Sequence, residues 1–188
     1  MINKLFLEMT SYFKGDQKRI NHFIKVHSFA KLIGEEENLD KETMFILETS
    51  ALTHDIGIKK SEELYSRNDG KIQEKLGPDE AEKMLRKLNF TDNVIDRVKF
   101  LIAHHHTYSN IDSMDYQILV ESDFLVNICE DNLSKDSAMK IKEKIFKTQT
   151  GKKLLENLFI YENHRPKGIG DFLLKGSNIY VQIKLTPM

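Results

Sequence analysis

Histidine and carboxylate residues stand at positions where the surrounding residues are apolar. His54 and Asp55 follow one apolar stretch, and Asp123 lies inside another. Imidazole nitrogens and carboxylate oxygens together suit a borderline or hard divalent metal. A carboxylate among apolar side chains is costly to bury unless it is paired or bound to a metal. These residue types therefore predict a divalent metal site.

The adjacent pair His54-Asp55 needs a helix end to act as a pair of ligands. Neighbouring residues in mid-helix project about 100° apart, so they do not share one face. At the C-terminal end of a helix both side chains can turn toward one point, where the partial negative charge also favours a cation. Two further ligands must come from elsewhere, and His22 and Asp123 both lie in apolar helical stretches.

Two histidines compete for the first ligand position. His22 and His27 are five positions apart. That spacing places them about 140° apart around a helix, so they cannot both be central ligands.

Several motifs in order resemble the HD superfamily of metal-dependent phosphohydrolases. They run from His22 with Val26 and Ala30, through Ala51-Leu52-Thr53-His54-Asp55-Ile56-Gly57 and Leu101-Ile102-Ala103-His104-His105-His106, to Glu121-Ser122-Asp123. The resemblance implies a compact all-α bundle of helices. It also implies one divalent metal ion (Fe, Mn, Mg, Ni, Co or Zn) held by His22, His54, Asp55 and Asp123. The positions of Val26 and Ala30 favour His22 over His27.

Some members of that superfamily hold a second metal through two additional histidines. One of these precedes a Gly-Pro, and here Leu76 occupies that position before Gly77-Pro78. The other comes from a His-His pair, for which His105 is the candidate. A leucine offers no lone pair, so we expect about one tightly held metal per chain.

The remaining site residues are expected to act on a phosphorylated substrate. Asp55 would orient or deprotonate water, and His104 or His105 would protonate a leaving group, since histidine titrates near neutrality. Lys59 and Lys71 would bind phosphate oxygens together with His106. Lys71 follows Gly70, which permits close approach of the backbone to a ligand.

The apolar periodicity of the chain is mostly helical. Helices are expected over residues 17–38, 41–54, 92–105, 115–131, 137–147 and 152–159, with another beginning at Pro78. Asp16 is the expected N-cap of the first of these. Residues 58–77 have poor periodicity and are expected to form a long loop. We expect an HD domain over residues 1–162 and an extension over 163–188, either a β-hairpin or a flexible tail.

The composition narrows the class of protein. The 188 residues carry a net charge of −1 and a single cysteine, Cys129, which is expected to pack in the core. The net charge near zero predicts no extended surface for binding nucleic acid. No apolar run is long enough to span a membrane. A cytoplasmic protein is expected, and a homodimer is compatible with the sequence.

The expected function is hydrolysis of a nucleotide or another small phosphoester. The alternative is an HD-fold module that binds or senses a nucleotide without turnover. Leu76 and the lack of a glutamate soon after His54-Asp55 motivate this alternative.

Overall fold

The chain folds into an assembly of helices. The structure is a computed structural model that describes residues 1–67 and 69–161, and every regular element among these residues is helical. The α-helices are α1 (Ile2–Tyr12), α2 (Gln17–Glu36), α3 (Lys41–Thr53), α4 (Gly57–Tyr65), α5 (Gly70–Lys87), α6 (Asp92–His104), α7 (Met114–Glu130), α8 (Lys135–Ile145) and α9 (Gln149–Leu155), and the π-helix η1 (Glu156–Ile160) follows. The expected all-α class is confirmed.

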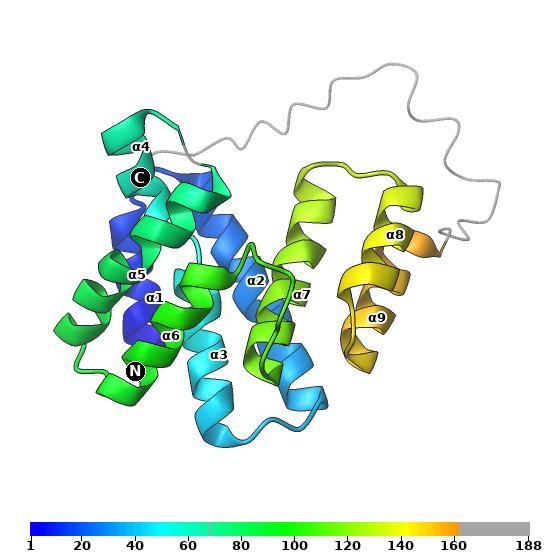
Figure 1. The fold of residues 1–188 in the computed structure, drawn as a ribbon, viewed down its shortest axis with the longest axis horizontal. Coiled ribbons are helices and arrows are strands. Elements are labelled where there is room, and N and C mark those ends of the chain that lie inside the picture. Colours follow the sequence, from blue (N-terminus) through cyan, green and yellow to red (C-terminus); the bar gives the residue numbers. More distant parts are fainter. Residues whose placement is uncertain (68, 162–188) are drawn as a thin grey trace, which may run out of the picture.

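Helices α2, α3 and α7 pack against one another at the centre of the molecule (Figure 1). Helix α3 also contacts α1 and α6, and its residues Leu47, Ala51 and Leu52 are fully buried. Helices α4, α5 and α6 lie on one side of this centre, and α8 and α9 pack on the other side against α7 (Figure 1). The three central helices are the ones that hold the expected metal ligands.

Short polar side chains fix where several helices begin and end. Asp16 accepts a hydrogen bond from the backbone amide of Arg19 and so caps α2, as expected. Asn38, Asn89 and Asn132 adopt positive φ angles of 59°, 60° and 51° just beyond α2, α5 and α7. Asparagine tolerates this left-handed conformation better than most residues, which makes it a suitable helix terminator.

The expectation of a long loop over residues 58–77 is wrong. Helix α4 begins at Gly57, and α5 begins at Gly70, so only a short link separates them. A Cβ atom on Gly57 would lie 2.8 Å from the backbone nitrogen of Gly77, so glycine is required where α4 and α5 meet. The weak periodicity of this segment reflects two helices that pack through backbone contact rather than through large apolar side chains.

Pro78 also lies elsewhere than expected, inside α5 rather than at its first turn. Proline removes one helical hydrogen bond. Helix α5 tolerates the loss because its buried face packs against α4 and α6, with Ala81 and Leu85 fully buried.

The expectation for Cys129 is wrong, and the expectation for residues 163–188 is not tested. Cys129 is exposed rather than buried in the core, because it lies on the outer face of α7. The hairpin or tail expected over residues 163–188 lies outside the described residues. Among the described residues, no helix combines the length and apolar character that crossing a membrane requires.

Candidate metal centre

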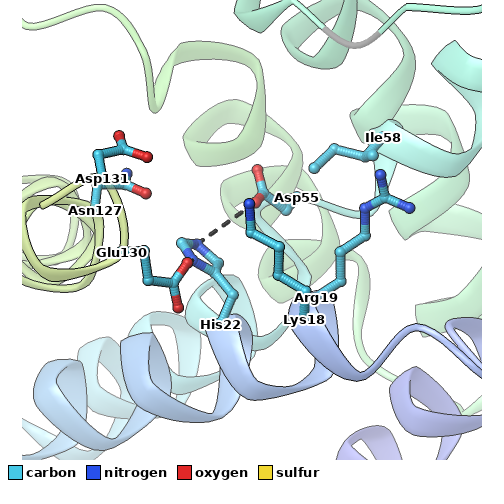
Figure 2. A pocket seen from close by; sticks show the side chains of 8 residues that line it. All are labelled: Lys18, Arg19, His22, Asp55, Ile58, Asn127, Glu130 and Asp131. Atoms are coloured by element: carbon cyan, nitrogen blue, oxygen red, sulfur yellow. Dashed lines mark hydrogen bonds and ion pairs between the residues drawn. The ribbon is translucent and has the colours of Figure 1, made fainter.

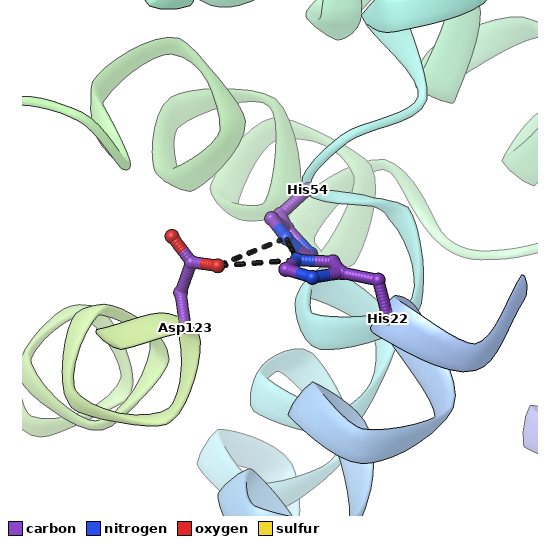
Figure 3. Close-up of side chains that lie close together, drawn as sticks. All are labelled: His22, His54 and Asp123. Atoms are coloured by element: carbon purple, nitrogen blue, oxygen red, sulfur yellow. Dashed lines mark hydrogen bonds and ion pairs between the residues drawn. The ribbon is translucent and has the colours of Figure 1, made fainter. Parts of the chain in front are cut away.

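The central helices bring His22, His54 and Asp123 together as one group of potential metal ligands, and Asp55 lies beside this group. His22 lies on α2, His54 and Asp55 directly follow the C-terminal end of α3, and Asp123 lies on α7. Figure 3 shows His22, His54 and Asp123 turned toward one another. These three residues are buried, with 8%, 1% and 6% of their surface exposed, and Asp55 is half-buried.

The distances between the donor atoms fit a common metal ion. His22 Nε2 lies 3.2 Å from His54 Nε2, 3.2 Å from Asp123 Oδ1 and 3.5 Å from Asp55 Oδ2. His54 Nε2 lies 3.5 Å from Asp55 Oδ2 and 3.6 Å from Asp123 Oδ1. Ligand atoms about 2.1 Å from a metal stand about 3.0 Å apart at right angles and about 3.4 Å apart at the tetrahedral angle. The donor set therefore fits one divalent ion in both chemistry and spacing.

Hydrogen bonds at the far side of each imidazole orient the ligand nitrogens. His54 Nδ1 donates to the carbonyl of Ala51 at 3.0 Å, which leaves its Nε2 with a lone pair toward the site. His22 Nδ1 donates to Oε2 of Glu130 at 3.1 Å. The other carboxylate oxygen of Glu130 accepts from Lys25 Nζ at 3.0 Å. A carboxylate behind a metal-binding histidine fixes its ring and makes it a better ligand.

The electrostatics of the cluster favour a positive charge. Burial lowers the pKa of His22, but the hydrogen bond to Asp123 and the charges of Asp55 and Asp123 outweigh it and raise the pKa to about 9. Burial raises the pKa of Asp123, and its hydrogen bonds with His22 and His54 hold that pKa well below its usual range. A bound divalent cation would satisfy the same preference for positive charge.

A second group of potential ligands adjoins the first through Asp55. The group comprises Asp55, His105 and His106. His105 Nδ1 donates to the carbonyl of Ile102 at 2.7 Å, and its buried Nε2 lies 3.5 Å from Asp55 Oδ1 without a hydrogen bond. His106 pairs with Oε1 of Gln73 at 3.2 Å, and burial and the neighbouring His105 lower its pKa to about 4. His106 is therefore neutral near pH 7 and offers no charge to a phosphate.

Three of the expected site residues do not join these groups. His104 donates through Nδ1 to the carbonyl of Phe100 at 2.7 Å and packs on the Phe100 ring. Lys59 donates to the carbonyl of Tyr12 at 3.1 Å. Lys71 pairs with Glu74 at 3.0 Å, and its side chain is 81% exposed.

His27, the competitor of His22, also lies outside the cluster. It pairs with Glu48 at 2.9 Å on another part of the α2 surface. The geometry thus brings His22 rather than His27 to the other ligands.

Sequence reasoning missed Glu130 and Lys18. Glu130 follows Asp123 by seven residues, which is two helical turns and therefore the same face of α7. That spacing is a signal that could have identified it. Lys18 precedes His22 by four residues and lies on the same face of α2, beside a cavity next to the cluster.

Comparisons with known proteins agree with this architecture. The crystal structure of a predicted HD superfamily hydrolase from an uncultured Thermotogales bacterium superposes with a TM-score of 0.60, at 22% sequence identity, over 82% of this chain and 83% of that chain. At 22% identity, this similarity shows that the two chains share a fold. A search of the curated proteins finds no match. The family model described as HD domain matches residues 19–148, a range that includes His22, His54, Asp55 and Asp123. The chain therefore belongs to the HD domain family.

Proposed function

We propose that this protein is a metal-dependent phosphohydrolase that acts on a nucleotide or another small phosphoester, with one divalent ion held by His22, His54, Asp55 and Asp123. The convergence of their donor atoms supports the proposal: the Nε2 atoms of His22 and His54 lie 3.2–3.6 Å from one another and from carboxylate oxygens of Asp55 and Asp123. The family match and the printed description of the Thermotogales structure as a predicted hydrolase also support it.

The chain supplies the setting for phosphoryl transfer, and the metal supplies the Lewis acidity. A divalent ion, when bound, polarises a phosphoryl oxygen and lowers the pKa of water. Asp55 faces two ways: Oδ2 points to His22 and His54, and Oδ1 points to His105. Asp55 can therefore orient a water molecule between the metal ligands and His105.

His105 is the proposed proton carrier. Its Nδ1 donates to the Ile102 carbonyl, so in the neutral ring Nε2 has a lone pair that can accept a proton from water. The Oδ1 of Asp55, 3.5 Å away, stabilises the positive charge that forms on the ring. That proton then passes to solvent, and solvent supplies the proton for the leaving oxygen, because in-line displacement places the attacking and leaving oxygens on opposite sides of phosphorus.

Metal replacement and phosphate release test the proposal. The protein is stripped with a chelator and reloaded separately with each candidate divalent metal. It is then assayed with p-nitrophenyl phosphate, bis(p-nitrophenyl) phosphate and nucleotides. We expect turnover only in reloaded samples, and a loss of at least about 100-fold in Asp123→Asn because each ligand contributes to holding the ion.

A matched control uses the histidine outside the cluster. His27→Gln removes the imidazole that pairs with Glu48, and it is expected to retain metal and turnover. Turnover that survives exhaustive chelation would overturn the proposal. Nucleotide binding without product under every condition would favour the alternative, a non-catalytic binding or sensing module.

A further inference from the structure

A cavity of about 180 Å³ opens beside the candidate metal centre (Figure 2). Its lining residues are Lys18, Arg19, His22, Asp55, Ile58, Asn127, Glu130 and Asp131. Because His22 and Asp55 form part of its wall, a molecule bound in this cavity touches the ligand cluster. The expected phosphate-binding residues Lys59 and Lys71 do not line it.

Two basic side chains, Arg19 and Lys18, line the cavity, and they differ in whether an acidic residue pairs with them. The guanidinium of Arg19 donates to Asp16 at 2.6 Å and to Glu62 at 2.5 Å, so its charge is already balanced. Within residues 1–67 and 69–161, no ion pair or hydrogen bond engages the ammonium of Lys18. Figure 2 shows the Lys18 side chain reaching from α2 into the cavity that Asp55 also lines. Lys18 is therefore available to an anionic group placed next to the cluster.

The opposite wall, from α7, offers hydrogen-bonding groups of another kind. Both carboxylate oxygens of Glu130 are occupied, by His22 and Lys25. The amide of Asn127 and the carboxylate of Asp131 point across the cavity in Figure 2. A carboxylate accepts hydrogen bonds from hydroxyl groups and repels phosphate. The cavity thus has one end suited to an anion and another suited to hydroxyl groups.

We infer that this cavity binds a phosphomonoester of a sugar, with the phosphate on Lys18 and the sugar hydroxyls on Asn127 and Asp131. The inference rests on the proposed function. A monoester has more negative charge than a diester, which suits an unpaired lysine beside a cation site. The volume is below the roughly 300–1,000 Å³ typical of drug-sized ligands. One sugar phosphate is therefore the recognised unit, and a nucleotide base contributes little.

The reaction balances as a hydrolysis. The oxygen of one water molecule forms a bond to phosphorus, and the bond between phosphorus and the sugar oxygen breaks. The proton that this water loses passes to solvent, and the sugar oxygen takes a proton from solvent and leaves as a hydroxyl group. Inorganic phosphate is the other product, and no oxidant or reductant is needed.

The first test removes the charge of Lys18. In metal-loaded Lys18→Gln we expect kcat/KM for a pentose 5-phosphate to fall about 10- to 100-fold, the effect of one charge-assisted hydrogen bond. Metal content should not change. Lys31→Gln is the matched control, because Lys31 is an exposed lysine on α2 that pairs with Glu35. It should stay within about twofold of wild type.

The second test compares substrates. Asp131→Ala should lower kcat/KM for the pentose phosphate more than for p-nitrophenyl phosphate, which has no hydroxyl groups. The matching nucleoside monophosphate should react within about threefold of the pentose phosphate. Faster cleavage of bis(p-nitrophenyl) phosphate, unchanged in Lys18→Gln, would overturn the inference.

Calorimetry separates failure of this inference from failure of the proposed function. The pentose 5-phosphate is titrated into the metal-loaded wild type and into Lys18→Gln. Binding that is lost in the variant, without turnover in the wild type, would support the cavity and overturn hydrolysis. Turnover that is equal in wild type and Lys18→Gln would keep hydrolysis and overturn the role of Lys18.

Discussion

At the scale of single residues, Glu130 is the link between the ligand cluster and the protein around it. It accepts hydrogen bonds from His22 and Lys25. Replacing Glu130 with leucine removes the acceptor that orients His22, so we predict a 10- to 100-fold loss of affinity for a divalent metal, the usual effect of such supporting residues. Competition with a chromogenic chelator measures this loss.

A second histidine–glutamate pair provides the control. Glu48→Leu breaks the bond to His27, which is a similar pair of residues outside the cluster. This variant should bind metal like the wild type. Equal affinity losses in the two variants would show that general destabilisation, rather than orientation of His22, causes the effect.

The number of bound ions is a separate prediction at this scale. His106, in the second group, already pairs with Gln73, and Leu76 supplies no ligand. We predict about one ion per chain by elemental analysis after gel filtration. We expect weaker binding of a further ion at high metal concentration, absent in His105→Ala. Two tightly held ions per chain would contradict this.

The residues that could be predicted from the sequence are those whose type conflicts with their surroundings. Asp123 lies in an apolar stretch and is buried at 6% exposure, so the carboxylate needed a partner, as the sequence suggested. Lys18 could not be recognised in this way. A lysine on a helix surface is ordinary, and whether the acidic residues that line the same cavity pair with it depends on how α2 packs against α7.

At the scale of elements, Glu121 ties the start of α9 to α7. Its buried carboxylate accepts hydrogen bonds from the backbone amides of Lys147 and Thr148 at 2.6 and 3.0 Å and from the Thr148 hydroxyl. A Cβ atom on Gly151 would overlap this carboxylate. We predict that Gly151→Ala lowers the free energy of unfolding by about 1–3 kcal/mol, as overpacking does.

Urea denaturation measures this change, and Lys152→Ala on the next position of α9 is the control, expected within about 0.5 kcal/mol of wild type. Metal affinity should be the same in both variants, because α9 supplies none of the four ligands. A Gly151→Ala protein as stable as the control would contradict the described contact.

A partly buried ion pair between Arg97 and Asp115 links α6 to the start of α7. Burial raises the pKa of Asp115, but the hydrogen bonds from Arg97 and Ser113 outweigh it and lower the pKa below 3.8. Because the folded value is the lower one, this stabilisation is complete above pH 3.8 and is lost as the pH falls through the folded pKa. We predict that Asp115→Asn is destabilised at pH 7 but loses less stability than the wild type on further acidification. Urea unfolding midpoints of the wild type and of Asp115→Asn, measured between pH 7 and 2, test this. Midpoints that fall by the same amount in both proteins would contradict it.

The prediction of elements failed where helices meet through backbone rather than through apolar side chains. Residues 58–77 lack an apolar stripe because Gly57 and Gly77 form the contact between α4 and α5. The local preference of proline predicts that Pro78 lies in the first turn of a helix. Pro78 instead lies in the middle of α5, which packs against α4 and α6. Where a helix has a regular apolar stripe and a capping residue, as α2 has with Asp16, the sequence predicted its start correctly.

At the scale of the whole molecule, the ligand cluster joins three helices that are far apart in the sequence. His22, His54 and Asp123 come from α2, the end of α3 and α7. An ion bound by all of them cross-links the centre of the fold, and an ion that binds only the folded chain stabilises it by mass action. We predict a rise in Tm with metal concentration in the wild type and a return to the starting value when a chelator is added.

Asp123→Ala separates metal binding from packing in this cluster. In the chelated protein Asp123 hydrogen-bonds His22 and His54, which hold its pKa well below its usual range, so its removal should lower the Tm of the chelated protein. The same variant should lose the increase of Tm with metal, because one of the four ligands is gone. His27→Gln should keep that increase, since His27 bonds Glu48 instead. Scanning calorimetry with and without Mn²⁺ decides the matter: a metal-dependent rise in Tm that persists in Asp123→Ala would place the ion elsewhere in the molecule.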